Sequence, residues 1–279
     1  MKQFFVIYIL LLSVLSARAT HNRAGEITFK HVGDSSSLEY EITITTYTKT
    51  SSVDADRPYL DTVHLGDGNR VRFVRVNGGG SGQPLPNDVK LNIYKIDNAS
   101  RTHVYPGSGT YDIYFIDPNR NGGVVNIPGS INVMFAIHAT LYINPNIIPD
   151  NSPQLLNPPI DHGCVGIPFL HNPGAYDPDG DSLSFSLVEC RGDGNVPIPG
   201  YSFPWAPNSF SLNPVTGQLV WDYPPSGGNY VPEYEVNVAF EIKEWRKLGG
   251  YYRLIGFVER DMQITISTCS NHPPQIASL

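Results

Sequence analysis

Three aspartates stand at alternate positions in one short stretch, Asp177-Pro178-Asp179-Gly180-Asp181, and this spacing could do chemistry. Acids at alternate positions of a tight turn can project to one side, where their oxygens would supply the hard ligands that calcium prefers. Three carboxylates held so close without a cation would repel one another. We therefore interpret Asp177, Asp179 and Asp181 as candidate calcium ligands.

Two alternatives to a calcium site stay open for this stretch. Asp-Pro and Asp-Gly pairs are ordinary turn formers, so a plain turn would need no ligand. A catalytic carboxylate pair would need two acids facing each other across a pocket, one with a raised pKa, and an exposed turn does not favour that arrangement. The sequence also has no G-x-S-x-G nucleophile turn and no H-E-x-x-H zinc motif. We therefore do not expect an enzyme.

The elements that must position these acids are strands. Residues 182–190, SLSFSLVEC, follow the aspartates directly and alternate polar with apolar side chains, as in a strand with one solvated face. No stretch keeps a 3.6-residue apolar period, and glycine (26) and proline (24) are plentiful enough to supply many turns. These patterns predict an all-β fold of antiparallel sandwiches. The other expected strands are residues 38–46, 109–117, 130–144, 209–214, 217–222, 233–245 and 253–268.

The first residues indicate the compartment. Lys2, an apolar run and Ala17-Arg18-Ala19 follow one another as in a secretory signal peptide, which predicts cleavage after residue 19. The formal charge of −7 becomes −9 once Lys2 and Arg18 are removed (−7 − 2 = −9). A chain this acidic has no electrostatic reason to bind nucleic acid or an anionic membrane surface. The mature chain has no apolar run long enough to span a membrane, so we expect an exported protein, extracellular or at the cell surface.

Proline and asparagine divide the chain into two halves. Residues 144–159, NPNIIPDNSPQLLNPP, cannot continue a strand ladder and mark a boundary. The halves are of ordinary domain size, and each could bury its own core. We expect a signal peptide at 1–19, a first Ig-like β-sandwich at 20–146, a linker at 147–159, a second Ig-like β-sandwich at 160–270, and a stub of linker to a further module at 271–279.

Two stretches of the first half carry a family resemblance. Residues 62–73 place Gly66-Asp67-Gly68 between apolar segments, where Asp67 beside glycine favours a hairpin turn over a catalytic role. Residues 103–115, HVYPGSGTYDIYF, follow with His103, Tyr105 and Tyr111. Together the two stretches resemble the PKD domain, an Ig-like extracellular module. The resemblance implies structural roles, with Tyr111 in the core and His103 near the turn.

The aspartate run carries a second resemblance. AYDPDGDSLSFSL, residues 175–187, resembles the A-x-D-x-D-x-G stretch of cadherin repeats. The resemblance implies that Asp177 and Asp179 bind calcium at the junction with the preceding domain, while Asp181 lies beyond the strict pattern. The cadherin linker corresponds here to PDNSPQ, residues 149–154, which offers Asp150 and Asn151 as further ligands.

The rest of the second half and the layout of the whole chain extend these resemblances. Residues 210–230, FSLNPVTGQLVWDYPPSGGNY, resemble cadherin-like and Ig-like bacterial repeats, which implies that Trp221 and Tyr230 are core residues. From THNRAGEITFKHVG through NPPIDHGC and IPGYSFP to RDMQITI, the chain is similar to bacterial gliding-motility-associated surface proteins. That likeness implies a surface protein of the type IX secretion route that acts in adhesion or gliding. With the aspartate run beside the proline- and asparagine-rich boundary, we expect a non-enzymatic, calcium-stiffened spacer. Its partners would be other surface proteins or polysaccharides.

Three cysteines in an exported chain suggest one disulfide and one remaining thiol. Cys164 precedes the first strand of the second half and Cys190 ends the next. If these strands are antiparallel neighbours, the two cysteines meet at one end of the sandwich. We therefore expect a Cys164–Cys190 disulfide, with Cys269 free or paired to a neighbouring module.

A carbohydrate-binding module is the alternative function. Tyr201, Phe203 and Trp205 in GYSFPWAP form a candidate aromatic platform of the kind that β-sandwiches present to sugars. A packed loop is the structural alternative for the same three residues.

Overall fold

The computed structural model describes residues 22–51, 57–118, 120–144, 146–159, 161–205, 209–226 and 233–270. Within these ranges the chain consists of β-strands joined by turns, and its helical structure is limited to short 3-10 turns at Gly78–Gly80, Ser130–Asn132 and Asp193–Asn195. The predicted all-β class is confirmed. The expected signal peptide and the expected stub at 271–279 lie outside the described residues.

Each of the eight segments expected to be strands contains one, and the structure adds further strands in both halves. The first half contains β1 (Asn22–Val32), β2 (Glu39–Lys49), β3 (Tyr59–His64), β4 (Arg70–Arg75), β5 (Gln83–Leu85), β6 (Val89–Ile96), β7 (Thr102–Val104), β8 (Gly109–Asp117) and β9 (Phe135–Ile143). The second half contains β10 (Gln154–Leu155), β11 (Asp161–Cys164), β12 (Phe169–His171), β13 (Ala175–Tyr176), β14 (Ser182–Val188), β15 (Phe210–Leu212), β16 (Leu219–Trp221), β17 (Glu233–Leu248) and β18 (Tyr251–Ser267).

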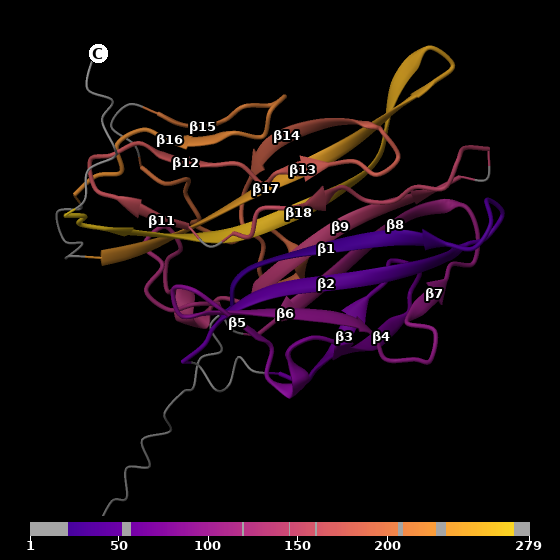
Figure 1. The fold of residues 1–279 in the computed structure, drawn as a ribbon, viewed down its shortest axis with the longest axis horizontal. Helices are drawn as coiled ribbons and strands as arrows, with labels where there is room; N and C mark the ends of the chain where they lie inside the picture. Colours follow the sequence, from indigo (N-terminus) through magenta and orange to yellow (C-terminus); the bar gives the residue numbers. More distant parts are fainter. Residues whose placement is uncertain are drawn as a thin grey trace, which may run out of the picture.

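One large sheet joins the two halves. Its strands run in the order β1-β2-β6-β4-β3-β8-β9-β18-β17-β14, and β1 pairs with β18 as well, so the first-half strands and β18 form a closed circuit of pairings. Figure 1 shows β18 between its hairpin partner β17 and the first-half strands β1 and β9. Smaller sheets of β12-β16-β15 and β10-β13 lie in the second half.

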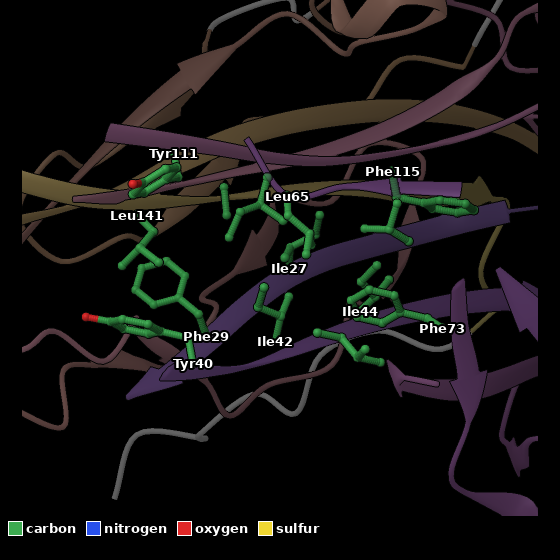
Figure 2. Packing of buried hydrophobic residues seen from close by; sticks show 14 of the residues in the cluster. Ile27, Phe29, Tyr40, Ile42, Ile44, Leu65, Phe73, Tyr111, Phe115 and Leu141 are labelled. Atoms are coloured by element: carbon green, nitrogen blue, oxygen red, sulfur yellow. The ribbon is translucent and has the colours of Figure 1, made fainter. Parts of the chain in front are cut away.

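The first core lies between the strands of the first half. Along β2 the side chains alternate between buried and half-buried, because successive residues of a strand point to opposite faces. Tyr40, Ile42 and Ile44 take the buried positions, each at most 1% exposed. In Figure 2 these residues and their neighbours on β1 face inward toward side chains from the far side of the core, among them Leu65, Tyr111, Phe115 and Leu141.

The predicted G-D-G hairpin closes one end of this core. β3 and β4 pair around residues 65–69, and Gly66 adopts φ +86°, a conformation that L side chains rarely take. Asp67 accepts hydrogen bonds from the Asn69 backbone N–H at 3.0 Å and contacts His103 Nε2 at 2.7 Å. Burial raises the pKa of Asp67, but its hydrogen bonds with Asn69 and His103 outweigh burial and lower it. Asp67 is thus held within the turn by its contacts with Asn69 and His103.

Aromatic rings continue from that turn into the core. His103 lies edge-on to Tyr105 at 4.8 Å between ring centroids, and Tyr105 is tilted against Tyr111 at 4.3 Å. The Tyr111 hydroxyl donates to the Gly107 carbonyl at 2.8 Å. Tyr105 and Tyr111 are thus buried in the first core, and His103 lies beside the turn.

The second core gathers around Trp221. This side chain is 1% exposed, its Nε1 donates to the Trp205 carbonyl at 3.1 Å, and it lies edge-on to Phe210 and Tyr234. The cluster also contains Ala24 and Tyr47 from the first half, so the second core is not made by the second half alone. Tyr230, expected in this core, lies outside the described residues.

The predicted linker is built into the body of the protein. The Ser152 backbone N–H donates to the Phe29 carbonyl at 3.0 Å, and the Phe29 N–H donates to Ser152 Oγ at 2.9 Å. Asp150 and Ser152 are at most 1% exposed. The division of the chain at 147–159 stays a prediction. In the structure, β18 of the second half pairs with β1 and β9 of the first half, and the hydrogen bonds of Ser152 join the predicted linker to β1.

The predicted Cys164–Cys190 disulfide is wrong. Cys164 is bonded to Cys269, with their Cα atoms 5.5 Å apart. β11 runs parallel to the end of β18, with Cys164 opposite Ser267, so the two chain segments finish together. The expectation assumed antiparallel neighbours, which would have put Cys269 at the opposite end. Cys190 is a free thiol, fully buried, and burial raises its pKa well above the ordinary value.

Candidate metal site

The aspartate run forms a tight turn between β13 and β14. Asp177 Oδ1 accepts the backbone N–H groups of Asp179 and Asp181, each at 2.9 Å, and Gly180 adopts φ +83°. The plain-turn alternative is therefore correct as a description of the backbone. It leaves the other carboxylate oxygens of the three aspartates free to act outside the turn.

Three acids from two segments converge beside this turn. Carboxylate oxygens of Asp150, Asp179 and Asp181 all lie within 4.8 Å of one another. Asn151 holds Asp179 in place, with its backbone N–H at 2.7 Å and its Nδ2 at 2.8 Å from the two oxygens of that carboxylate. The Asn151 side-chain oxygen accepts the backbone N–H of His31 on β1 at 2.9 Å, so Asn151 links Asp179 to β1.

Arg246 on β17 enters the space between these acids. Its Nε lies 2.8 and 3.0 Å from the two oxygens of Asp181, and its Nη2 lies 2.7 Å from Asp150 Oδ1 and 3.5 Å from Asp179 Oδ2. Its Nη1 donates to the Ile148 carbonyl. A guanidinium thus takes the place between Asp150, Asp179 and Asp181 that the sequence analysis assigned to calcium.

Glu244 approaches the same cluster from the buried side. It is 0% exposed, and neither of its oxygens has a hydrogen-bond donor among the described residues. Asp150 Oδ2 and Asp177 Oδ2 are likewise buried without a donor in that part of the chain. As carboxylates, Glu244 and Asp177 could bond to each other only through a shared proton.

Gly256 leaves room for these oxygens. It lies opposite Glu244 in the pairing of β17 with β18. A Cβ atom at this position would lie 2.7 Å from Glu244 Oε2, 2.8 Å from the Thr140 carbonyl oxygen and 3.5 Å from Asp150 Oδ2. The oxygens therefore pack directly against the backbone of Gly256, where a larger residue would displace them.

The electrostatics of the cluster favour neutral or cation-bound acids. Burial raises the pKa of Asp150 to about 8; Arg246 partly offsets this effect, whereas Asp181 and Asp179 add to it. Burial, then Asp150 and Asp177, raises the pKa of Glu244 well above its ordinary value. Arg246 thus contacts Asp150, Asp179 and Asp181. Asp177 acts electrostatically on Asp150 and on Glu244, so Asp177 and Glu244 belong to the same cluster.

Glu244 and Arg246 were not among the predicted site residues, although the pattern of β17 contains a signal for Glu244. Its apolar residues alternate through Val236, Val238, Phe240 and Ile242, all buried, and Glu244 takes the next position on that face. A charged residue where alternation predicts an apolar one marks a buried polar site.

The candidate aromatic platform is partly packed and partly open. The Tyr201 hydroxyl donates to the Asn237 carbonyl at 3.2 Å, and the Tyr201 ring lies edge-on to Phe203. Phe203 is 40% exposed and Trp205 is 68% exposed. Both line a cavity of about 360 Å³, together with Val125, Asn126, Ser202, Pro204, Trp221, Pro225, Ser226, Tyr234 and Val236.

Comparisons with known proteins add little to this picture. The chain matches no protein-family model and no curated protein sequence. It is similar to a solved structure titled "Tandem Ig repeats of Dlar", at 11% identity over 88% of this chain and 98% of that chain, with a TM-score of 0.25. A likeness this weak carries no argument, so the all-β class is based on the strand pairing above. Among the described residues, no helix is long and apolar enough to cross a membrane.

Proposed function

We propose that this protein is a non-enzymatic exported surface or extracellular protein built of Ig-like modules, acting in adhesion or as a spacer in a gliding-associated surface structure. Its acidic cluster would bind calcium and fix the two halves of the chain at a constant angle. The observation that carries the proposal is the convergence of Asp150, Asp179 and Asp181 within 4.8 Å. These acids belong to the segment between the halves and to a turn of the second half.

Charge balance supports a cation in this cluster. Two like charges about 4 Å apart repel by about 4 kcal/mol at an effective dielectric constant of 20. Arg246 supplies one positive charge to the three acids that contact it, Asp150, Asp179 and Asp181. Calcium takes six to eight oxygen ligands, and this cluster offers carboxylate oxygens with no histidine or thiol among the acids that form it.

The first prediction concerns calcium and Asp179. We expect calorimetric titration of the mature chain with calcium chloride to show binding, and EDTA to lower the melting temperature. Asp179→Asn removes one charge from the cluster and should weaken calcium binding several-fold. Asp193→Asn, in an exposed turn elsewhere, is the matched control and should have no effect. Absence of calcium binding, together with a melting temperature that EDTA leaves unchanged, would refute the calcium-stiffened spacer.

A second candidate function is carbohydrate binding, favoured by the exposed ring of Trp205 beside a cavity of about 360 Å³. If this is the function, glycan-array binding should be lost in Trp205→Ala, because stacking on an open aromatic face is how such sites hold sugar rings. Tyr251→Ala is a suitable control, since Tyr251 is 75% exposed on the β17–β18 turn. Binding that survives in Trp205→Ala, or is absent from the wild type, would remove this candidate.

A further inference from the structure

Four buried oxygens of the acidic cluster are left over once Arg246 has made its contacts. They are Asp150 Oδ2, Asp177 Oδ2 and both oxygens of Glu244, and none has a donor among the described residues. Burying an ionised carboxylate without a partner costs several kcal/mol per ion, because the charge loses its hydration. The folded protein therefore needs bound protons or a cation at this point to neutralise these acids.

Arg246 does not pair with these four oxygens. The hydrogen bonds of its guanidinium go to Asp181, to Asp179 Oδ2, to Asp150 Oδ1 and to the Ile148 carbonyl. One oxygen of Asp150, Oδ1, thus accepts from the guanidinium, while Oδ2 has no donor among the described residues. The unpartnered oxygens lie on the inner side of the cluster, where Glu244 is 0% exposed.

Two of the unpartnered oxygens lie near each other beside Gly256, where the absence of a side chain lets them approach the backbone of β18. Glu244 Oε2 and Asp150 Oδ2 lie 2.7 and 3.5 Å from one point, the position of a Cβ at Gly256, so they are at most 6.2 Å apart (2.7 + 3.5 = 6.2). A calcium ion bonded to both at about 2.3–2.6 Å would span up to about 5 Å. The Thr140 carbonyl oxygen lies 2.8 Å from the same point. Oxygens thus approach this point from β9, β17 and the segment before Ser152.

We propose that Glu244, Asp150 and Asp177 form a buried binding site for one calcium-sized divalent cation, separate from the Arg246-filled space between Asp150, Asp179 and Asp181. This inference rests on the proposed function and moves its ion to the inner side of the cluster. Arg246 then acts as a fixed positive charge that holds the outer aspartates, and the ion ties β17 to the segment between the halves. Because the donors are carboxylate oxygens, a hard cation fits this site better than zinc or copper.

The test uses the full mature chain, calcium chloride as the only ligand, and two variants that keep side-chain shape. Glu244→Gln removes the buried charge, and Asp177→Asn keeps an oxygen for the two backbone N–H groups of the turn. Each should lower calcium affinity at least tenfold, and more than Asp179→Asn does. Glu233→Gln, exposed on the same strand, is the control and should bind calcium as the wild type does.

Stability without calcium gives a second readout. In EDTA, Glu244→Gln should melt at the same temperature as the wild type or higher, because it removes an uncompensated buried charge, and this result also shows that the variant folds. Added calcium should raise the melting temperature of the wild type but not that of Glu244→Gln.

Two outcomes separate this inference from the proposed function. If Glu244→Gln and Asp177→Asn bind calcium as the wild type does while Asp179→Asn loses binding, the ion lies among the outer aspartates; the inference is then wrong and the proposed function stands. If the wild type takes up no calcium, both fail. A Glu244→Gln protein that does not fold leaves Asp177→Asn to decide, since its turn hydrogen bonds are retained.

Discussion

Single residues in this protein carry charge into places where strand patterns predict apolar side chains. Glu259 on β18 is fully buried, with one oxygen 2.9 Å from Arg191 Nε and the other without a donor among the described residues. Burial raises its pKa to about 8; Arg191 opposes this effect, and Asp261 adds to it. At neutral pH the folded protein therefore keeps a proton on Glu259 that the unfolded chain releases.

That difference predicts a pH dependence of stability. Because the pKa of Glu259 is raised on folding, its protonated form stabilises the fold at low pH, and this contribution is lost as pH rises from about 4.5 toward 8. The slope is about 1.4 kcal/mol per pH unit in that window. Urea unfolding at pH 6 and pH 7.5 gives the free energy of unfolding of the wild type and of Glu259→Gln. Between these two pH values the wild type should lose about 2 kcal/mol of stability relative to the variant. A gap independent of pH would contradict this.

Among the strands and turns, local patterns were informative and long-range pairing was not. The alternation in residues 38–46 and 109–117 corresponds to β2 and β8, because an alternating pattern needs only one buried face to form. The expected strand at 130–144 begins only at Phe135, since Ser130–Asn132 form a 3-10 turn. Element type was thus predictable from the sequence, and boundaries less so.

Which strand lies beside which depends on the whole fold. The polar residues Glu259, Arg260 and Asp261 of β18 look like a solvated stretch, yet each is 0% exposed because β18 lies between β17 and the first-half strands. The Cys164–Cys269 bond was missed for the same reason, since nothing local to either cysteine indicates that β11 runs parallel to β18. At the acidic cluster, Asp150, Asp179 and Asp181 were predicted, whereas Glu244 and Arg246 came to light only through the register of β17.

At the scale of the whole molecule, buried ion pairs connect the halves. Arg120, in the connection between β8 and β9, lies 2.8 Å from Asp261 on β18, and both side chains are 0% exposed. Asn237 Nδ2 donates to Asp261 Oδ1 at 2.9 Å, and Arg120 Nη2 donates to the Arg191 carbonyl at 2.9 Å. Burial lowers the pKa of Arg120, but Asp261, Cys190 and Tyr201 together outweigh burial and raise it. A first-half connection is thereby fixed to a second-half strand.

We therefore predict that the two halves unfold together and that Arg120→Ala weakens both. Removing one partner of a buried pair strands the other charge, which should lower the free energy of unfolding by about 3–5 kcal/mol. Arg72→Ala is the control, because Arg72 and its partner Asp61 are 52% and 75% exposed and should contribute no more than about 1 kcal/mol.

Urea unfolding can be followed by tryptophan fluorescence, which reports the second half since Trp205, Trp221 and Trp245 all lie there, and by circular dichroism, which reports every strand. The two transitions should coincide in the wild type and shift together in Arg120→Ala, because β18 belongs to both halves. If the fluorescence transition stays in place while the circular dichroism transition splits, the halves unfold independently and this prediction is wrong.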